Sequence, residues 1–365
     1  MTKYIIRRVL QAVPVLFGIT IVVYGILLAA PGGPVERFAN NPRVTEEQRI
    51  AFIKRWGLDQ PIPVQYCRWM GICNPDHDGL AAFISDSGVP NVLPAAFGGG
   101  DNGILHGDFG VSIDSGQPVA DRITASLLPT IILAGSALIL WVLAAILLGT
   151  IAALRPYSMF DSGLTVFTYI GFAMPTFWLG IMLIYLFSGP GLNILPAGGM
   201  TNARLSPSFG TPDYWTWFGA NPLSAIVDLG KHLILPVITL IVVNVAADSR
   251  FVRGSMLETL GLDYVRTAKA KGLPPRTVTF KHAFRNAMLP VVTNIGLELP
   301  FLFTGAIVTE TIFSWPGVGR LTIQATNQFD YPMLMGLLLI ASVATVTANL
   351  LADIVYAVVD PRIKY

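Results

Sequence analysis

The sequence contains little charge and few reactive side chains. Lys, Arg, Asp and Glu make up 13% of its 365 residues, and it has four His and two Cys. A soluble globular domain carries about 25% charged residues, so this composition argues against one. The net charge of +2 is small and the basic residues form no stripe, so a nucleic-acid-binding protein is not indicated either.

Several motifs of catalysis and cofactor binding are missing. Gly98 to Gly100 is followed by no G-K-[ST], and no Walker A sequence occurs elsewhere. No H-E-x-x-H or G-x-S-x-G is present, and the scattered His residues predict no metal site. Asp108 to Gly110 spells D-F-G, but the other parts of a kinase are absent. We therefore expect no enzyme activity and no cofactor in this chain alone.

Long apolar runs dominate what is present. Hydrophobic residues make up 53% of the chain, and its mean hydropathy is +0.60. About 20 apolar residues cross a bilayer, so the runs predict an all-α integral membrane protein with six transmembrane helices. The first run is too long for a signal peptide and lacks a cleavage site. The fourth is short, and we expect its helix to begin near Ala225 and continue towards Leu260. The runs are Val9 to Ala30, Leu127 to Leu154, Leu164 to Phe187, Leu233 to Ala247, Met288 to Val308, and Met333 to Tyr356.

The basic residues predict the orientation of these spans. Lys3, Arg7 and Arg8 precede the first span, eight Lys and Arg residues lie in 248–285, and two more close the chain. Cytoplasmic loops carry the excess of Lys and Arg, so both termini are expected in the cytoplasm. The predicted parts are an N-terminal transmembrane helix (1–30), a periplasmic loop (31–121), and a core of five transmembrane helices (122–362). That core contains a cytoplasmic loop at 248–285.

The long outer loop contains both cysteines. Cys67 and Cys73 could form a disulfide in an oxidising compartment, and two free thiols are an equal alternative. Thr45 to Leu58 has helical spacing of its apolar residues and a Thr that can cap it. Residues 74–103 are rich in Gly, Pro, Asp and Asn, which is typical of an irregular insertion.

The most basic stretch runs from Asp263 to Pro290, between two apolar segments. Tyr264 to Lys271 predicts a short helix, which Gly272 can end in a left-handed turn. One interpretation is a docking site for a soluble partner. The alternative is a basic juxtamembrane loop that sets topology and contacts anionic lipid.

The order of residues in this stretch resembles the EAA loop of ABC importer permeases. Arg266-Thr267-Ala268, then Gly272, then Leu289-Pro290 is most similar to the dipeptide, oligopeptide and nickel branch. Arg266 and Thr267 stand where the general motif has Glu and Ala. Any role that the family gives to a carboxylate at this position is therefore not assigned to this chain. The resemblance implies a helix that couples the chain to an ATPase. The residues it assigns to coupling are Asp263, Arg266, Thr267, Ala268, Lys271 and Gly272.

Other phrases extend this resemblance along the whole chain except about 74–103. They include the N-terminal R-R-x-L-Q, the A-M-P-T-F-W that begins at Ala173, and E-T-I-F-S-W-P-G-V-G-R from Glu310 to Arg320. The resemblance implies the type I permease fold of ABC importers. In that family the last phrase lies near the dock of the binding protein, which assigns this role to Glu310, Trp315, Pro316 and Gly317.

The same resemblance implies several partners. These are a second, homologous permease subunit, two cytoplasmic ABC ATPase subunits that bind ATP and Mg, a periplasmic solute-binding protein, and membrane lipid. The expected location is the bacterial inner membrane.

Polar groups within the spans are candidates for a translocation pathway. Pro175 and Thr176 interrupt the third span, and Asn294 and Glu298 lie in the fifth. Gly and Pro in a span can open polar backbone to a cavity, and an ionisable group at membrane depth often faces one. The alternatives are a kinked packing helix and a structural hydrogen bond.

Arg250 and Arg253 lie one helical turn apart after the fourth span. They are expected to snorkel at the membrane edge or, alternatively, to contact the partner.

Three functions compete at this point. The first is a permease subunit of an ATP-driven importer of di- or oligopeptides, with nickel, glutathione or a sugar as alternative substrates. The second is an ion-coupled secondary transporter, which needs intramembrane acidic relays and internal repeats. Glu298 is one strong intramembrane carboxylate, and no repeat is found. The third, an intramembrane enzyme, needs a catalytic pair inside the spans, and none is found.

Overall fold

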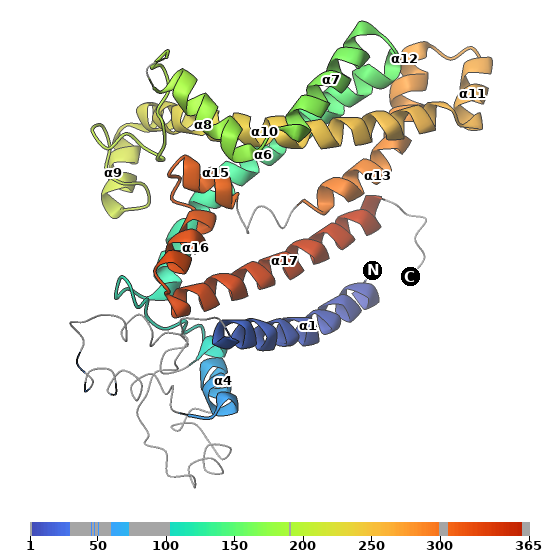
Figure 1. Ribbon diagram of the computed structural model, residues 1–365. Helices are drawn as coiled ribbons and strands as arrows, with labels where there is room; N and C mark the ends of the chain where they lie inside the picture. The colour runs from blue at the N-terminus through green and yellow to red at the C-terminus, as the bar shows by residue number, and fades with distance from the viewer. Residues whose placement is uncertain are drawn as a thin grey trace. The chain divides into compact units, whose positions relative to one another are not determined.

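The computed structural model describes residues 2–29, 45, 47, 50, 60–72, 103–189, 191–298 and 306–359. Within these residues the regular structure is helical (Figure 1), apart from one isolated bridge between Val111 and Pro118. This confirms the predicted all-α class. The longer helices are α1 (Thr2–Ala29), α4 (Ile62–Met70), α6 (Val119–Leu154), α7 (Met159–Ala173), α8 (Thr176–Phe187), α9 (Pro212–Ala220), α10 (Pro222–Leu260), α11 (Asp263–Ala270), α13 (Arg285–Gly296), α16 (Val318–Asn327) and α17 (Tyr331–Val359).

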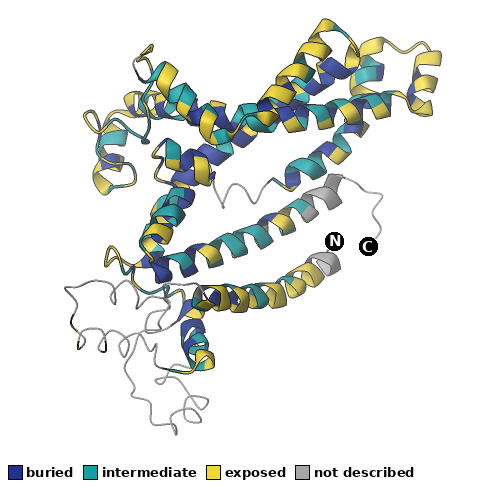
Figure 2. Cartoon of the chain, viewed as in Figure 1, coloured by how far each residue is buried: buried dark blue, intermediate teal, exposed yellow. Residues whose placement is uncertain are grey.

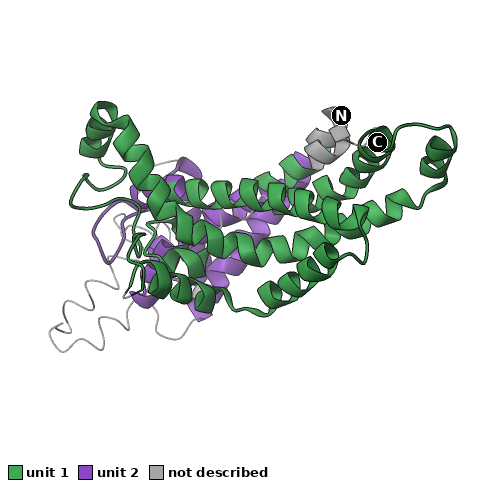
Figure 3. Cartoon of the chain, turned by 90° about the horizontal axis from the view of Figure 1, so that it is seen from above, with its two compact units in different colours: residues 1–7, 129–319, 347–365 green, residues 8–128, 320–346 purple. Residues whose placement is uncertain are grey.

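The chain forms two compact units, which Figure 3 colours separately. Unit 1 comprises residues 1–7, 129–319 and 347–365, and unit 2 comprises residues 8–128 and 320–346.

Among the residues that the structure describes, four helices are long and apolar enough to cross a membrane. They contain Ile6–Ile26, Val119–Leu154, Pro222–Leu260 and Tyr331–Ala352. The predicted extent of the fourth helix is confirmed, because α10 begins at Pro222 and ends at Leu260. Large apolar side chains along α1 are exposed (Figure 2), such as Leu10 at 65% and Ile26 at 63%. Such side chains suit contact with lipid or with other membrane helices.

The predicted third span is not one helix. It is divided into α7 and α8, whose axes differ by 101°. Met174 is extended, with ψ of 120°, because the residue before a proline is pushed away from the helical region. Pro175 occupies the N-cap position of α8, without a capping hydrogen bond from its side chain. The bent pair counts as at most one further span, which gives up to five among the described residues.

The predicted fifth span is only partly described. Its first helix, α13, has 12 residues, which is shorter than a membrane crossing requires. Residues 299–305 lie outside the described part of the chain, and the short helix α15 (Ile307–Ile312) follows. The count of six spans therefore stays a prediction.

The core of unit 1 forms where α6 and α10 pack together. Leu133 and Trp141 of α6 are buried with Leu240 and Val245 of α10. Gly149 permits this close approach, because an added Cβ would lie 2.5 Å from the carbonyl oxygen of Ser249. Small residues allow helix backbones to approach in the same way throughout membrane proteins.

Unit 2 has an aromatic core that joins α1 to α4. Tyr24 and Trp69 are buried with their ring centroids 5.5 Å apart. Thr20 Oγ1 and Tyr66 Oη lie 2.7 Å apart, and Tyr24 Oη donates to Gln65 Oε1 at 3.3 Å. Buried tyrosines are stable in such a core because their hydroxyls find partners.

Cys67 of α4 is disulfide-bonded, which is one of the two states that the sequence left open. Cys73, the chain's other cysteine, lies outside the described residues, as do residues 74–102 and most of the predicted helix from Thr45 to Leu58.

Candidate functional site

The predicted coupling helix is α11, which lies at one end of α10 (Figure 1). It runs from Asp263 to Ala270, one residue earlier than predicted at each end. Gly272 has a φ of 74° and its N–H donates to the carbonyl oxygen of Lys269. The left-handed turn at Gly272 is therefore confirmed, and it is a conformation that costs a non-glycine residue about 1–2 kcal/mol.

The helix α11 has a buried face and an exposed face. Val265 and Ala268 are buried against Val278 and Ala283. The placement of Ala268 corrects the expectation that it contacts a partner, because its methyl group faces the protein interior. The other five residues assigned to coupling are exposed, namely Asp263, Arg266, Thr267, Lys271 and Gly272.

The charged pair on the exposed face is loosely held. Arg266 Nη1 lies 3.5 Å from Asp263 Oδ1, and the two side chains are 72% and 97% exposed. Exposed pairs of this kind contribute little stability. Both side chains thus remain able to pair with charges on a partner.

A π-helix supports α11. It spans Val278–Phe284 and follows a single turn, α12 (Pro275–Thr277). The sequence predicted a loop here, since nothing local signals a π-helix. The π-helix leads into α13, where Asn286 Nδ2 donates to the Tyr264 hydroxyl at 2.9 Å. Elements of this rare type occur mostly at functional sites.

Polar contacts attach this assembly to α10. Ser255 Oγ donates to the carbonyl oxygen of Ala287 at 2.6 Å, which joins α10 to α13. Val252 and Met256 of α10 are buried against Ala287 and Val291 of α13. The helices α10, α11 and α13 therefore form one packed assembly within unit 1.

Arg253 was expected to snorkel at the membrane edge or to contact a partner. In the structure it instead forms an ion pair inside unit 1. Its Nε and Nη2 donate to Oδ1 and Oδ2 of Asp161 at 2.6 and 2.7 Å. Asp161 lies in the first turn of α7 and also accepts from the backbone N–H of Tyr157. Such a bidentate pair is among the stronger polar contacts in proteins. It fastens α7 to α10.

The sequence around Asp161 contains a local signal for the start of α7. Ser158 caps α7 and its hydroxyl accepts from the N–H of Asp161. Ser or Thr followed three residues later by an acidic residue is a known sign of a helix start. Arg250 makes a different contact, since its guanidinium lies 5.2 Å from the Tyr169 ring centroid and 5.7 Å from that of Phe172.

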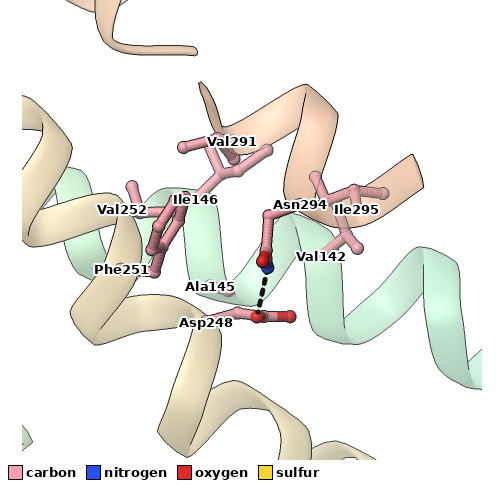
Figure 4. A pocket seen from close by; sticks show the side chains of 9 residues that line it. All are labelled: Val142, Ala145, Ile146, Asp248, Phe251, Val252, Val291, Asn294 and Ile295. Carbon is pink, nitrogen blue, oxygen red and sulfur yellow. Dashed lines mark hydrogen bonds between the residues drawn. The ribbon is translucent and has the colours of Figure 1, made fainter. Parts of the chain in front are cut away.

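A small pocket lies between α6, α10 and α13 in unit 1 (Figure 4). Most of its lining is apolar, and its polar side chains are Asp248 and Asn294. Asn294 Nδ2 donates to Asp248 Oδ1 at 3.2 Å, and Trp141 Nε1 donates to Asp248 Oδ2 at 3.0 Å. The sequence prediction included Asn294 and missed Asp248, which ends an apolar run and looked like the start of a loop.

The other predicted pathway residues do not line this pocket. Pro175 and Thr176 lie at the break between α7 and α8, where Pro175 is exposed. Glu298 is half-buried just beyond α13, within electrostatic range of Asp248. The structure thus brings Asn294 together with Asp248, and the pathway role of all four residues stays a prediction.

Three of the four residues that were predicted to form the binding-protein dock are buried inside the protein. Glu310 and Trp315 are fully buried in unit 1. Glu310 Oε1 accepts from Thr130 Oγ1 at 2.8 Å, and Trp315 Nε1 donates to the carbonyl oxygen of Pro129 at 2.9 Å. A buried carboxylate needs such partners, so these two side chains shape the turn and cannot contact a partner directly. Pro316 is exposed, whereas Gly317 is buried.

The long apolar helices define the chain as a multi-pass membrane protein. Residues 145–365 match the family described as binding-protein-dependent transport system inner membrane component. Residues 1–81 match the N-terminal family of the same systems. The chain belongs to this family of permeases.

Curated relatives match over the whole chain. It is 38% identical to the oligopeptide transport system permease protein AppB of Bacillus subtilis, with 100% of both chains covered. It is 35% identical to the dipeptide transport system permease protein DppB of Escherichia coli K12, covering 100% of this chain and 99% of the relative. It is 33% identical to the di/tripeptide transport system permease protein DppB of Pseudomonas aeruginosa, with the same coverage.

Proposed function

We propose that the chain is one permease subunit of an ATP-driven importer of di- or oligopeptides. The names of the relatives support peptides over the nickel, glutathione and sugar alternatives. The observation that carries the coupling role is the exposed charged face of α11, held on a buried packing face by the π-helix. In this proposal a second permease subunit, two ATPase subunits that bind ATP and Mg, and a solute-binding protein complete the transporter.

The orientation follows from the same proposal. The exposed face of α11 is in the cytoplasm, together with 248–285 and both termini, as the Lys and Arg distribution favours. Residues 31–121 are then periplasmic, and the membrane is the bacterial inner membrane. An oxidising compartment on that side also accounts for the disulfide at Cys67.

Transport then follows from a shift between two packings of the helices. ATP-driven closure of the ATPase subunits moves α11, and α11 is continuous in packing with α10 and α13, whose side chains line the pocket. A partner changes the population of two conformations only by binding them with different free energies. The exposed residues of α11 supply that difference, because a soluble subunit can reach them.

The test is uptake by the complete transporter in proteoliposomes. The complex, purified through a tag on this chain and supplied with its binding protein, should accumulate a labelled tripeptide only when ATP is present. Uptake that persists without nucleotide and stops when an ionophore removes the ion gradient would establish the secondary transporter instead. ATP-dependent uptake of a nickel chelate or sugar, and of no peptide, would replace the substrate and keep the mechanism.

A further inference from the structure

The carboxylate of Asp248 has no cationic partner among the described residues. Its two oxygens accept hydrogen bonds from the neutral groups of Trp141 and Asn294. The nearest cations along α10 are engaged elsewhere: Arg250 stacks on Tyr169 and Phe172, and Arg253 pairs with Asp161. Asp248 is half-buried and follows directly on the apolar run that ends at Ala247.

A carboxylate in this setting is costly unless something compensates its charge. Even partial burial of a charge costs free energy unless the charge is paired or hydrogen-bonded. Each carboxylate oxygen can accept about two hydrogen bonds, so one donor on each leaves capacity for a further donor. Glu298, the other carboxylate within electrostatic range, adds repulsion and supplies no donor when ionised. The pocket therefore offers negative charge and acceptor capacity together.

The chemistry that fits is a protonated amine. We propose that the pocket at Asp248 receives the α-ammonium group of a peptide during its passage, so that Asp248 is a specificity-determining residue. An α-amino group is mostly protonated at neutral pH, because its pKa is about 7.7–8.0. The ammonium group carries three donors and a full positive charge. This inference rests on the proposed peptide transport.

The apolar residues that line the rest of the pocket are consistent with a site that recognises only the amino group of a peptide. Asp248 and Asn294 lie among aliphatic side chains of α6, α10 and α13, together with the Phe251 ring (Figure 4). Such a lining makes no directional contact with a particular peptide side chain. The pocket is small, which suits one ammonium group rather than a whole peptide. A free amino terminus is common to peptides of every sequence, so the pocket selects the class without selecting a member.

The substitution Asp248→Asn separates charge from shape. The new amide is the same size and offers one oxygen and one NH2 group. Trp141 Nε1 can still donate to that oxygen, and Asn294 can turn its own amide so that its oxygen accepts from the new NH2. Both hydrogen bonds are retained and only the charge is removed. Asp228→Asn is the matched control, because Asp228 is another largely buried Asp of α10 and does not line the pocket.

The experiment compares two substrates in proteoliposomes that contain the complete transporter and its binding protein. One is trialanine, and the other is propionyl-dialanine, which has the same skeleton with hydrogen in place of the ammonium group. The ratio of variant to wild-type uptake is measured for each substrate. The same binding protein serves both transporters, so its own preference for the amine cancels in this ratio.

We expect Asp248→Asn to lower trialanine uptake at least about tenfold below saturation, as loss of a charge-assisted hydrogen bond predicts. Uptake of propionyl-dialanine should stay at the wild-type rate, and Asp228→Asn should not discriminate between the two. Equal losses of uptake for both substrates would mean that Asp248 only holds the helices together. Wild-type uptake of trialanine by the variant would mean that Asp248 contacts no amine. Either result overturns the inference while wild-type peptide uptake leaves the proposed function intact. Absence of ATP-dependent peptide uptake by the wild type overturns both.

A second readout applies if the binding protein does not hold propionyl-dialanine. The purified complex without binding protein is titrated with each compound, and the fluorescence of Trp141 is isolated by subtraction of a Trp141→Phe complex. Trialanine should change this fluorescence and propionyl-dialanine should not, since Trp141 donates directly to Asp248. Equal responses to the two compounds, or none to trialanine, contradict the proposal.

Discussion

The guanidinium of Arg253 meets the carboxylate of Asp161 with two hydrogen bonds, Nε to Oδ1 at 2.6 Å and Nη2 to Oδ2 at 2.7 Å. These residues are 92 positions apart in the sequence, and their contact ties the start of α7 to α10. Asp161 is almost fully buried, whereas Arg253 keeps some exposure. The pair therefore joins α7 to α10 through a contact that water screens only partly.

The fork of two bonds predicts that Arg253→Lys is not a conservative change. Lysine keeps the charge but cannot donate two parallel bonds to one carboxylate. We expect a loss of about 1–3 kcal/mol in the free energy of unfolding, measured by thermal or denaturant unfolding of the purified complex. Arg155→Lys is the control, because Arg155 is exposed in the neighbouring turn and its replacement should be nearly neutral. Equal unfolding midpoints for both variants would contradict the role of the pair.

Gly272→Ala should lower uptake more than it lowers ATP hydrolysis. A Cβ at this position meets no atom within 4 Å, so its cost arises from the φ of 74° and not from a clash. That strain shifts the turn that ends the exposed face of α11. The measurement is the number of peptides imported per ATP hydrolysed by the reconstituted transporter.

Gly116→Ala is the matched control for this prediction. Gly116 has a φ of 67° and equally open surroundings, but it belongs to unit 2 and lies outside α11. It should suffer similar strain and retain its coupling ratio. A normal ratio for Gly272→Ala, or the same loss in both variants, would remove the assigned role of the turn.

The two faces of α11 predict opposite outcomes for two alanines. Ala268 is buried against Val278 and Ala283, whereas Ala270 is exposed. Ala268→Leu should destabilise the loop by about 1–3 kcal/mol through overpacking, and Ala270→Leu should leave stability near wild type. Limited proteolysis of the 248–285 region measures the difference. Comparable protection of the two variants would show that the buried face is wrongly assigned.

Gly317 and Glu310 predict a clash that a second substitution can relieve. A Cβ on Gly317 would lie 2.4 Å from the carboxyl carbon of Glu310. Gly317→Ala should therefore lower the unfolding midpoint, and Glu310→Asp in the same chain should recover part of the loss, because the shorter side chain withdraws its carboxylate.

Gly219→Ala serves as the control, because this glycine is in α9 and has open surroundings. An alanine there should be neutral or stabilising, since alanine favours helix by about 1 kcal/mol over glycine. If Glu310→Asp worsened the loss caused by Gly317→Ala, the packing explanation would fail.

The sequence predicted the features that depend on neighbouring residues. The extent of α11, the turn at Gly272 and the length of α10 follow from helix formers, a glycine and a long apolar run. The bend at Met174 and Pro175 was marked by the proline, but its angle depends on what α7 and α8 pack against. For example, Gly180 of α8 approaches Phe313, and Gly171 of α7 approaches Val242.

The features that escaped prediction join residues far apart in the chain. Asp248 meets Trp141 across 107 positions, and Glu310 meets Thr130 across 180. No local pattern records such pairs, so an acidic residue at the end of a span looked like the start of a loop. The π-helix was missed for another reason, because its residues do not differ in type from those of an ordinary helix.

The helix α10 joins the pocket to the ion pair without interruption, and this fixes the spacing of the two sites by residue count. Its 39 residues include both Asp248 and Arg253. One inserted or deleted residue between them would rotate everything beyond it by about 100° around the helix axis. Arg253 would then turn away from Asp161, and the attachment of α11 would turn with it. This stretch should tolerate many changes of side chain and almost no change of length.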